Sequence, residues 1–101
     1  MEKVYLGQGF ILDQLRKAST HVIPLHDRKG DGVGFIIVDR YALNMRVTMR
    51  KAYSRDRRQQ DFPAKEMGMW MGPALRHMGR SFYWNVQIGK EQAKGLDNEQ
   101  A

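Results

Sequence analysis

Hydrophobic and polar positions alternate most clearly over residues 43–49, and this period of two predicts a β-strand with one apolar and one wet face. The apolar positions are Leu43, Met45, Val47 and Met49. Two strands are expected before it, because 33–39 is a nearly continuous apolar run and 20–27 is apolar and β-branched despite Pro24. The glycines of "RKGDG" between them predict a tight reversal. The three segments therefore predict a meander.

A period of three to four residues replaces this alternation in two other segments. Residues 10–18 place apolar side chains on one helical face and charged side chains on the other. A second helix is expected to begin near Asp61, with Pro63 in its first turn, and to run to Gly79. The Gly-Pro pair at 72–73 predicts either a kink or a division into two short helices.

Short strands are also expected towards both ends of the chain. Residues 4–6 precede a glycine turn, and 81–88 form a segment rich in aromatic residues. This order predicts an α+β fold, in which the meander and the C-terminal strand form an antiparallel sheet of about four strands with two helices packed on one face. The length of 101 residues predicts one compact domain, at 1–89, and the polar residues 90–101 are expected to form a frayed tail.

Composition narrows the chemistry open to this domain. The chain has no cysteine, which excludes disulfides, thiolate nucleophiles and cysteine-based metal sites. Its three histidines are scattered, and its glycine-rich loop does not open a helix, so we expect no metal and no cofactor. No apolar run reaches the length of a membrane span, and no signal-peptide pattern follows the first residues. We therefore expect a cytoplasmic protein without membrane contact.

Positive charge is concentrated in the segment "RVTMRKAYSRDRR", residues 46–58. The whole chain carries +6, and this segment holds six cationic residues against one carboxylate, a net +5. The candidate nucleic-acid-binding residues are Arg46, Arg50, Lys51, Tyr53, Arg55, Arg57 and Arg58. Five of the six cations are arginines, which grip phosphate or carboxylate in a bidentate manner, and Tyr53 offers a ring on which a base can stack. The segment predicts a small non-enzymatic protein that binds DNA or RNA through phosphates, although a solvated loop is the plainer interpretation.

A protein-interaction module is the alternative hypothesis. The arginine-rich segment suits an acidic protein surface as well as nucleic acid. The neighbouring residues Met67, Met69 and Trp70 form an apolar cluster that predicts either part of the core or a partner-binding or homodimer face. Met69 discriminates between these two interpretations, because it is out of phase with the apolar stripe of the expected helix. Small inhibitors and accessory proteins of phages and plasmids fit this class.

A small metal-dependent nuclease is a minor alternative. Asp27, Asp31 and Asp39 are expected near the two ends of the hairpin, where convergence would create a cation site beside the basic segment. Acidic residues are also ordinary turn formers. No serine or histidine stands in a pattern that predicts nucleophilic catalysis, so we assign no catalytic residue.

Overall fold

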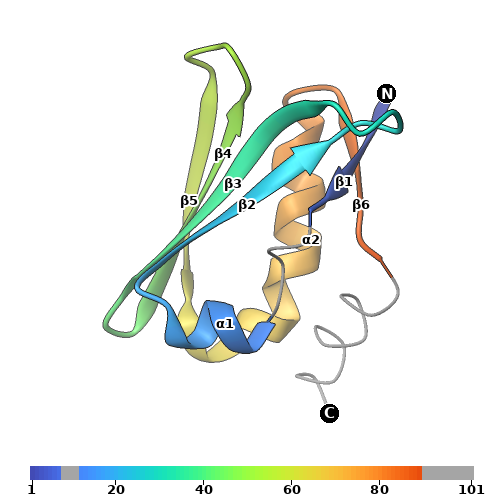
Figure 1. Ribbon diagram of the computed structural model, residues 1–101. Coiled ribbons are helices and arrows are strands. Elements are labelled where there is room, and N and C mark those ends of the chain that lie inside the picture. Colours follow the sequence, from blue (N-terminus) through green and yellow to red (C-terminus); the bar gives the residue numbers. More distant parts are fainter. Residues whose placement is uncertain (8–11, 90–101) are drawn as a thin grey trace.

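A curled sheet of six strands, in the order β5-β4-β3-β2-β1-β6, dominates the computed structural model, which describes residues 1–7 and 12–89 (Figure 1). The strands are β1 (Glu2–Leu6), β2 (Thr20–His26), β3 (Gly32–Tyr41), β4 (Asn44–Lys51), β5 (Arg57–Pro63) and β6 (Trp84–Gln87). Neighbouring strands pair in antiparallel fashion, except that β1 and β6 are parallel. The predicted tail at 90–101 lies outside the described residues.

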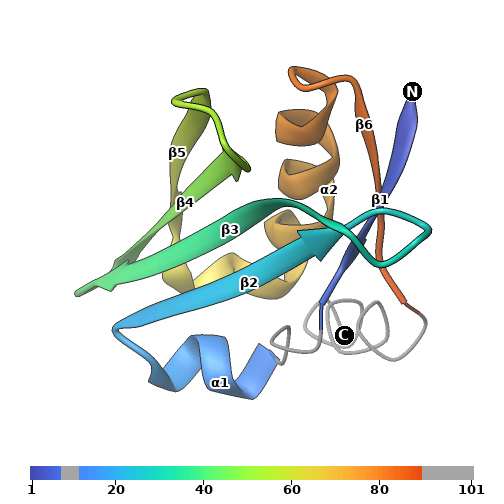
Figure 2. The ribbon, with the colours of Figure 1, turned by 45° about the horizontal axis from the view of Figure 1, so that its top comes forward.

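Three helical segments complete the described chain. They are α1 (Leu12–Lys17), the 3₁₀ turn η1 (Ala64–Glu66) and α2 (Met67–Arg80). The long helix α2 lies against the inner side of the curled sheet, and α1 lies beside the end of α2 that follows η1 (Figures 1 and 2). In the part of the chain that the structure describes, no helix is long and apolar enough to cross a membrane.

The core fills the space between α2 and the inner face of the sheet. Alternate residues of the strands are fully buried there, and they form one cluster with Met71 and Leu75 of α2 and with Leu15 of α1. Close approach of helix and sheet depends on Gly79, because an added Cβ at this position would lie only 2.6 Å from Cγ2 of Val86. A core on one side of the sheet leaves the opposite side free to carry a site.

The α+β class is confirmed, but the expected sheet of about four antiparallel strands is not exact, because the sheet has six strands and its β1–β6 pair is parallel. The meander is present as β2, β3 and β4. The strand expected at 4–6 inserts next to it as β1 and pairs in parallel with β6, which brings Glu2 opposite Trp84. Local periodicity carries no information on a parallel pairing between segments so far apart in the sequence.

Strand β5 lies where residues 51–60 were expected to form an exposed loop or a projecting strand end, and it also replaces the expected start of the second helix. It is an edge strand whose inward positions include Arg58 and Gln60, so its sequence shows no apolar alternation. The chain leaves β5 at Pro63, passes through η1 and enters α2 only at Met67. From there α2 continues to Arg80 without division, with Pro73 on its exposed side.

Candidate functional site

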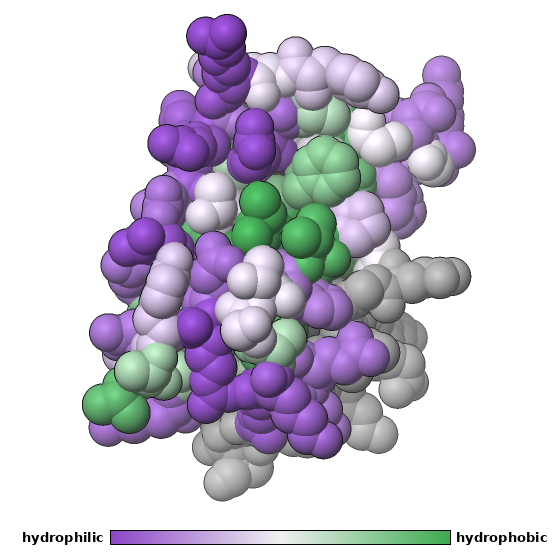
Figure 3. All heavy atoms as spheres, turned by 60° about the vertical axis from the view of Figure 1, so that its left-hand side comes forward, coloured by the Kyte–Doolittle hydropathy of each residue, from purple (hydrophilic) through white to green (hydrophobic). Residues whose placement is uncertain are grey.

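The outer face of the sheet, meaning the side turned away from α2, carries an apolar patch that no described element covers. The patch consists of Val22 and Pro24 on β2 and Phe35 and Ile37 on β3. Val22 is 51% exposed and Phe35 is 45% exposed. Figure 3 shows hydrophobic side chains in the middle of one face with hydrophilic side chains around them. A contiguous apolar patch with a polar rim is typical of a binding site.

The register of the strands sets cationic side chains directly beside this apolar patch. One row across the outer face runs Arg57, Arg50, Phe35, Pro24, from β5 to β2. Neighbouring strands lie about 4.8 Å apart, so the row spans roughly 15 Å. Its β5 and β4 positions are guanidinium groups and its β3 and β2 positions are apolar. The row therefore offers a surface for a ligand that has both charge and a flat apolar part.

The turn between β4 and β5, residues 52–56, extends the cationic end of this row. A hollow of about 450 Å³ lies at its base and is lined by Phe35, Arg50, Lys51, Ala52, Tyr53, Ser54 and Arg55. Tyr53 is fully exposed and has a φ of 57°, which is the left-handed region that disfavours bulky residues. A solvent-exposed ring in this position contributes nothing to the core.

Arg46 and Arg58, two of the predicted nucleic-acid-binding residues, lie away from the β4–β5 turn. Arg46 lies further along the outer face, where its Nε donates to Oδ1 of Asp61 at 2.9 Å and its Nη2 donates to Oδ2 at 3.3 Å. Arg58 is turned to the inner side, and its guanidinium carbon lies 5.3 Å from the centre of the Phe82 ring. The structure thus gathers Arg50, Lys51, Tyr53, Arg55 and Arg57 at one end of the sheet and separates Arg46 and Arg58 from them.

At the far end of the outer face, the positive charge of Arg46 is neutralised by its ion pair with Asp61. The hydrogen bonds from Arg46 lower the pKa of the Asp61 carboxyl, and the carboxylate in turn raises the pKa of Arg46. Tyr41 lies on the same guanidinium, with its ring centre 5.2 Å from the guanidinium carbon. Nearby, Asp39 accepts a hydrogen bond from the Thr20 hydroxyl at 2.9 Å. The unbalanced positive charge of the outer face is therefore found at its Arg50–Arg57 end.

The predicted Met/Trp cluster divides between core and surface. Met67 is 2% exposed and belongs to the core. Trp70 stacks on Phe62 with ring centres 4.1 Å apart, and its Nε1 donates to the carbonyl oxygen of Pro63 at 2.7 Å. Met69 is 54% exposed on the outer surface of α2, so it is the member of the cluster that remains available to a partner.

The three carboxylates of the nuclease hypothesis do not meet. Oδ1 of Asp27 accepts from the backbone amides of Lys29 and Asp31, which makes Asp27 the residue that shapes the β2–β3 turn. Asp39 lies near the other end of β3. Within residues 1–7 and 12–89, no three side chains of the metal-binding types come together.

The apolar patch was missed at the level of sequence. A continuous run of hydrophobic residues over 33–39 is typical of a strand that is buried on both sides, and nothing in it marks Phe35 as exposed. The alternation of exposed and buried residues in β3 appears only when its neighbours are known.

Comparison with protein families, with curated sequences and with solved structures finds no match for this chain.

Proposed function

We propose that this protein binds single-stranded nucleic acid across the outer face of its sheet, without a chemical step. Phosphates contact Arg50, Arg57 and Arg55, and a base stacks on Phe35. The observation that carries the proposal is the cross-strand row in which two arginines are followed by an exposed aromatic ring. Aromatic rings beside a positively charged track are the standard means by which proteins hold single strands.

A single strand suits this face better than a duplex. A duplex offers its phosphates but keeps the flat faces of its bases stacked inside, so the exposed ring of Phe35 would find no partner. A single strand presents charge and base faces together, in the same order as the row on the sheet. The roughly 15 Å of the row has room for two or three nucleotides.

An acidic protein surface would meet the same arginines, and the experiment must separate the two partners. Labelled oligothymidylate and oligouridylate are titrated with the protein at low and at moderate salt, with an unlabelled duplex of equal length as competitor. We expect saturable binding that weakens steeply as salt rises, because neutralised phosphates release counterions. We also expect the duplex to compete poorly.

The variant Phe35→Ala tests the stacking step separately from the charge. Loss of one stacked base costs about 1–3 kcal/mol, so affinity should fall roughly 5- to 150-fold while the slope of affinity against salt stays the same. Met69→Ala is the control, since Met69 is similarly exposed but lies on α2, on the opposite side of the core. Absence of binding at low salt would overturn the proposal and favour an acidic protein. Preference for the duplex, with no effect of Phe35→Ala, would overturn the single-strand assignment.

A further inference from the structure

A second hollow lies at the other end of β4, on the inner side of the sheet. Its volume is about 610 Å³, which is in the range of sites for small organic ligands. It opens between the β3–β4 turn, the end of β5, η1 and α1. The lining residues are Arg16, Arg40, Ala42, Leu43, Asn44, Met45, Pro63, Ala64, Lys65 and Met67.

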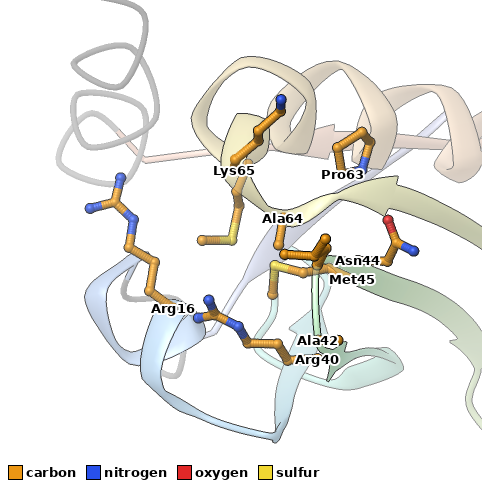
Figure 4. Close-up of a pocket in the computed structure, with 10 residues that line it drawn as sticks. Arg16, Arg40, Ala42, Asn44, Met45, Pro63, Ala64 and Lys65 are labelled. Atoms are coloured by element: carbon orange, nitrogen blue, oxygen red, sulfur yellow. The ribbon is translucent and has the colours of Figure 1, made fainter.

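This hollow is lined by cationic side chains around an apolar floor. Met45 and Met67 are almost completely buried and supply the floor, together with Ala64. Arg16 and Arg40 lie on one side of Met45 and Ala64, and Lys65 lies on the other side with its ammonium group pointing away from them (Figure 4). None of the described lining residues is a carboxylate. Arg16 also forms an ion pair with Asp13, at 3.9 Å.

Strand register keeps this hollow separate from the outer face. Arg40 and Met45 are partners across β3 and β4, and both point to the inner side. Their neighbours Asp39 and Arg46 are also partners, and both point to the outer face. The two surfaces therefore share strands but use different side chains, and a change in one can be made without removing a residue of the other.

We propose that this hollow binds a small organic anion, with its acid group held by Arg40 and Arg16 and its apolar body resting on Met45 and Met67. Arginine presents parallel donors that match either a carboxylate or a phosphate monoester. Lys65 at the rim adds a third positive charge that favours the same sign of ligand. Methionine side chains adapt to apolar bodies of different shape, which suits a floor for such a ligand. This site is independent of the proposed binding of nucleic acid.

The test uses methyl-labelled methionine and three probes that share one apolar body: 4-phenylbutyrate, 4-phenylbutyl phosphate and the neutral 4-phenylbutanol. We expect saturable shifts of the Met45 and Met67 methyl signals with both anions, at a Kd of about 1 mM or tighter. The exposed methyl group of Met69 should not respond. The alcohol should bind at least roughly tenfold more weakly than the better anion, since it lacks the charge that Arg40 recognises. Comparison of the two anions shows whether a carboxylate or a phosphate is preferred.

The variant Arg40→Gln supplies the decisive comparison. Arg40 is exposed, so the fold should be retained, which the unliganded methionine spectrum checks directly. Affinity for the preferred anion should fall about tenfold, while affinity for the alcohol and for oligonucleotides stays unchanged. Arg76→Gln, on the exposed side of α2, is the charge-matched control. The proposal is overturned if Met45 and Met67 do not shift, if the alcohol binds as well as the anions, or if Arg40→Gln leaves anion binding intact.

Discussion

Arg50 and Arg57 are directly opposite each other in the β4–β5 pair, so their two guanidinium groups project side by side from the outer face. Like charges in this relationship disfavour the pairing of their strands. Four residues away on each of the same strands, Arg46 is instead paired with Asp61. The β4–β5 hairpin thus has one cross-strand pair of opposite charges, Arg46–Asp61, and one of like charges, Arg50–Arg57. A bound anion would stabilise the hairpin most beside the pair of like charges.

Replacement of this pair should weaken binding without harming the fold. For Arg50→Gln with Arg57→Gln, we expect equal or slightly higher thermal stability, because the repulsion between the strands is removed. The slope of log affinity against log salt should become shallower by about 1.4, since two phosphate contacts to a single strand are lost. Oligonucleotide titrations at several salt concentrations measure the slope.

The control for this variant removes equal charge elsewhere. Arg76→Gln with Arg80→Gln takes two cations from the exposed side of α2 and lowers the net charge by the same amount. If this control flattens the salt slope as much as the Arg50 and Arg57 changes do, binding follows the total charge and the assigned row is wrong.

Tyr53 should show a trade-off between stability and binding. Its φ of 57° is unfavourable for tyrosine and free of strain for glycine, so Tyr53→Gly should raise the free energy of unfolding by up to about 1 kcal/mol. The same change removes the exposed ring beside Arg55, and affinity for single strands should fall several-fold. Chemical denaturation and oligonucleotide titration measure the two effects on one protein.

Tyr83 provides a matched control for this prediction. It is also exposed and also has a positive φ, of 59°, but it lies in the turn between α2 and β6. Tyr83→Gly should therefore stabilise the fold to a similar extent and leave affinity unchanged. Equal loss of affinity in both variants would mean that exposed tyrosines act without regard to position, against the site assigned at the β4–β5 turn.

Trp70 should prove to be mainly a structural residue. Its ring joins the start of α2 to the end of β5 through the stack on Phe62 and the hydrogen bond to Pro63. Trp70→Phe keeps an aromatic ring but loses the donor and some apolar area, and we expect a loss of about 1–2 kcal/mol in the free energy of unfolding. Met69→Ala, one residue earlier on the exposed side, should change it by less than about 0.5 kcal/mol. An unchanged midpoint for Trp70→Phe in denaturant would show that this contact does not hold helix and strand together.

Sequence alone could place some of the outer face correctly. The alternation over 43–49 separates Met45 and Val47 from Arg46, and the structure has the first two in the core and the third on the outer face. That inference works because a strand next to a core must send every second side chain into it. It fixes the orientation of a side chain within its own strand but not its neighbours on the next strand.

The missing information was the pairing of strands. The second helix was expected to begin near Asp61, yet Asp61 lies in β5 as the partner of Arg46 and neutralises one member of the basic segment. Likewise, Arg58 looks equivalent to Arg57 in the sequence, but adjacent residues of a strand face opposite sides, so Arg58 reaches Phe82 on the inner side. Neither the Arg46–Asp61 pair nor the inward direction of Arg58 could be predicted without knowing that residues 57–63 form a strand.

Asp61 should lower the affinity for single strands, because its carboxylate neutralises Arg46 on the outer face. Asp61→Asn leaves the strand and its shape intact but removes the carboxylate that holds Arg46. Arg46 then becomes available to a phosphate, so affinity for single strands should rise and the salt slope should steepen by about 0.7. Unchanged affinity and slope would place Arg46 beyond the reach of the bound strand.

Acid pH should reproduce part of this change in the unaltered protein. Because Arg46 lowers the pKa of Asp61 in the folded state, the stabilising contribution of the pair is fully present above the ordinary carboxyl pKa of 3.8 and is lost as pH falls through the lower folded value. A carboxyl-detected NMR titration should therefore show that Asp61 stays ionised to a lower pH in the unaltered protein than in an Arg46→Gln variant. If Asp61 protonates at the same pH in both proteins, the pair does not hold in solution and Arg46 belongs with Arg50 and Arg57 among the cations of the outer face.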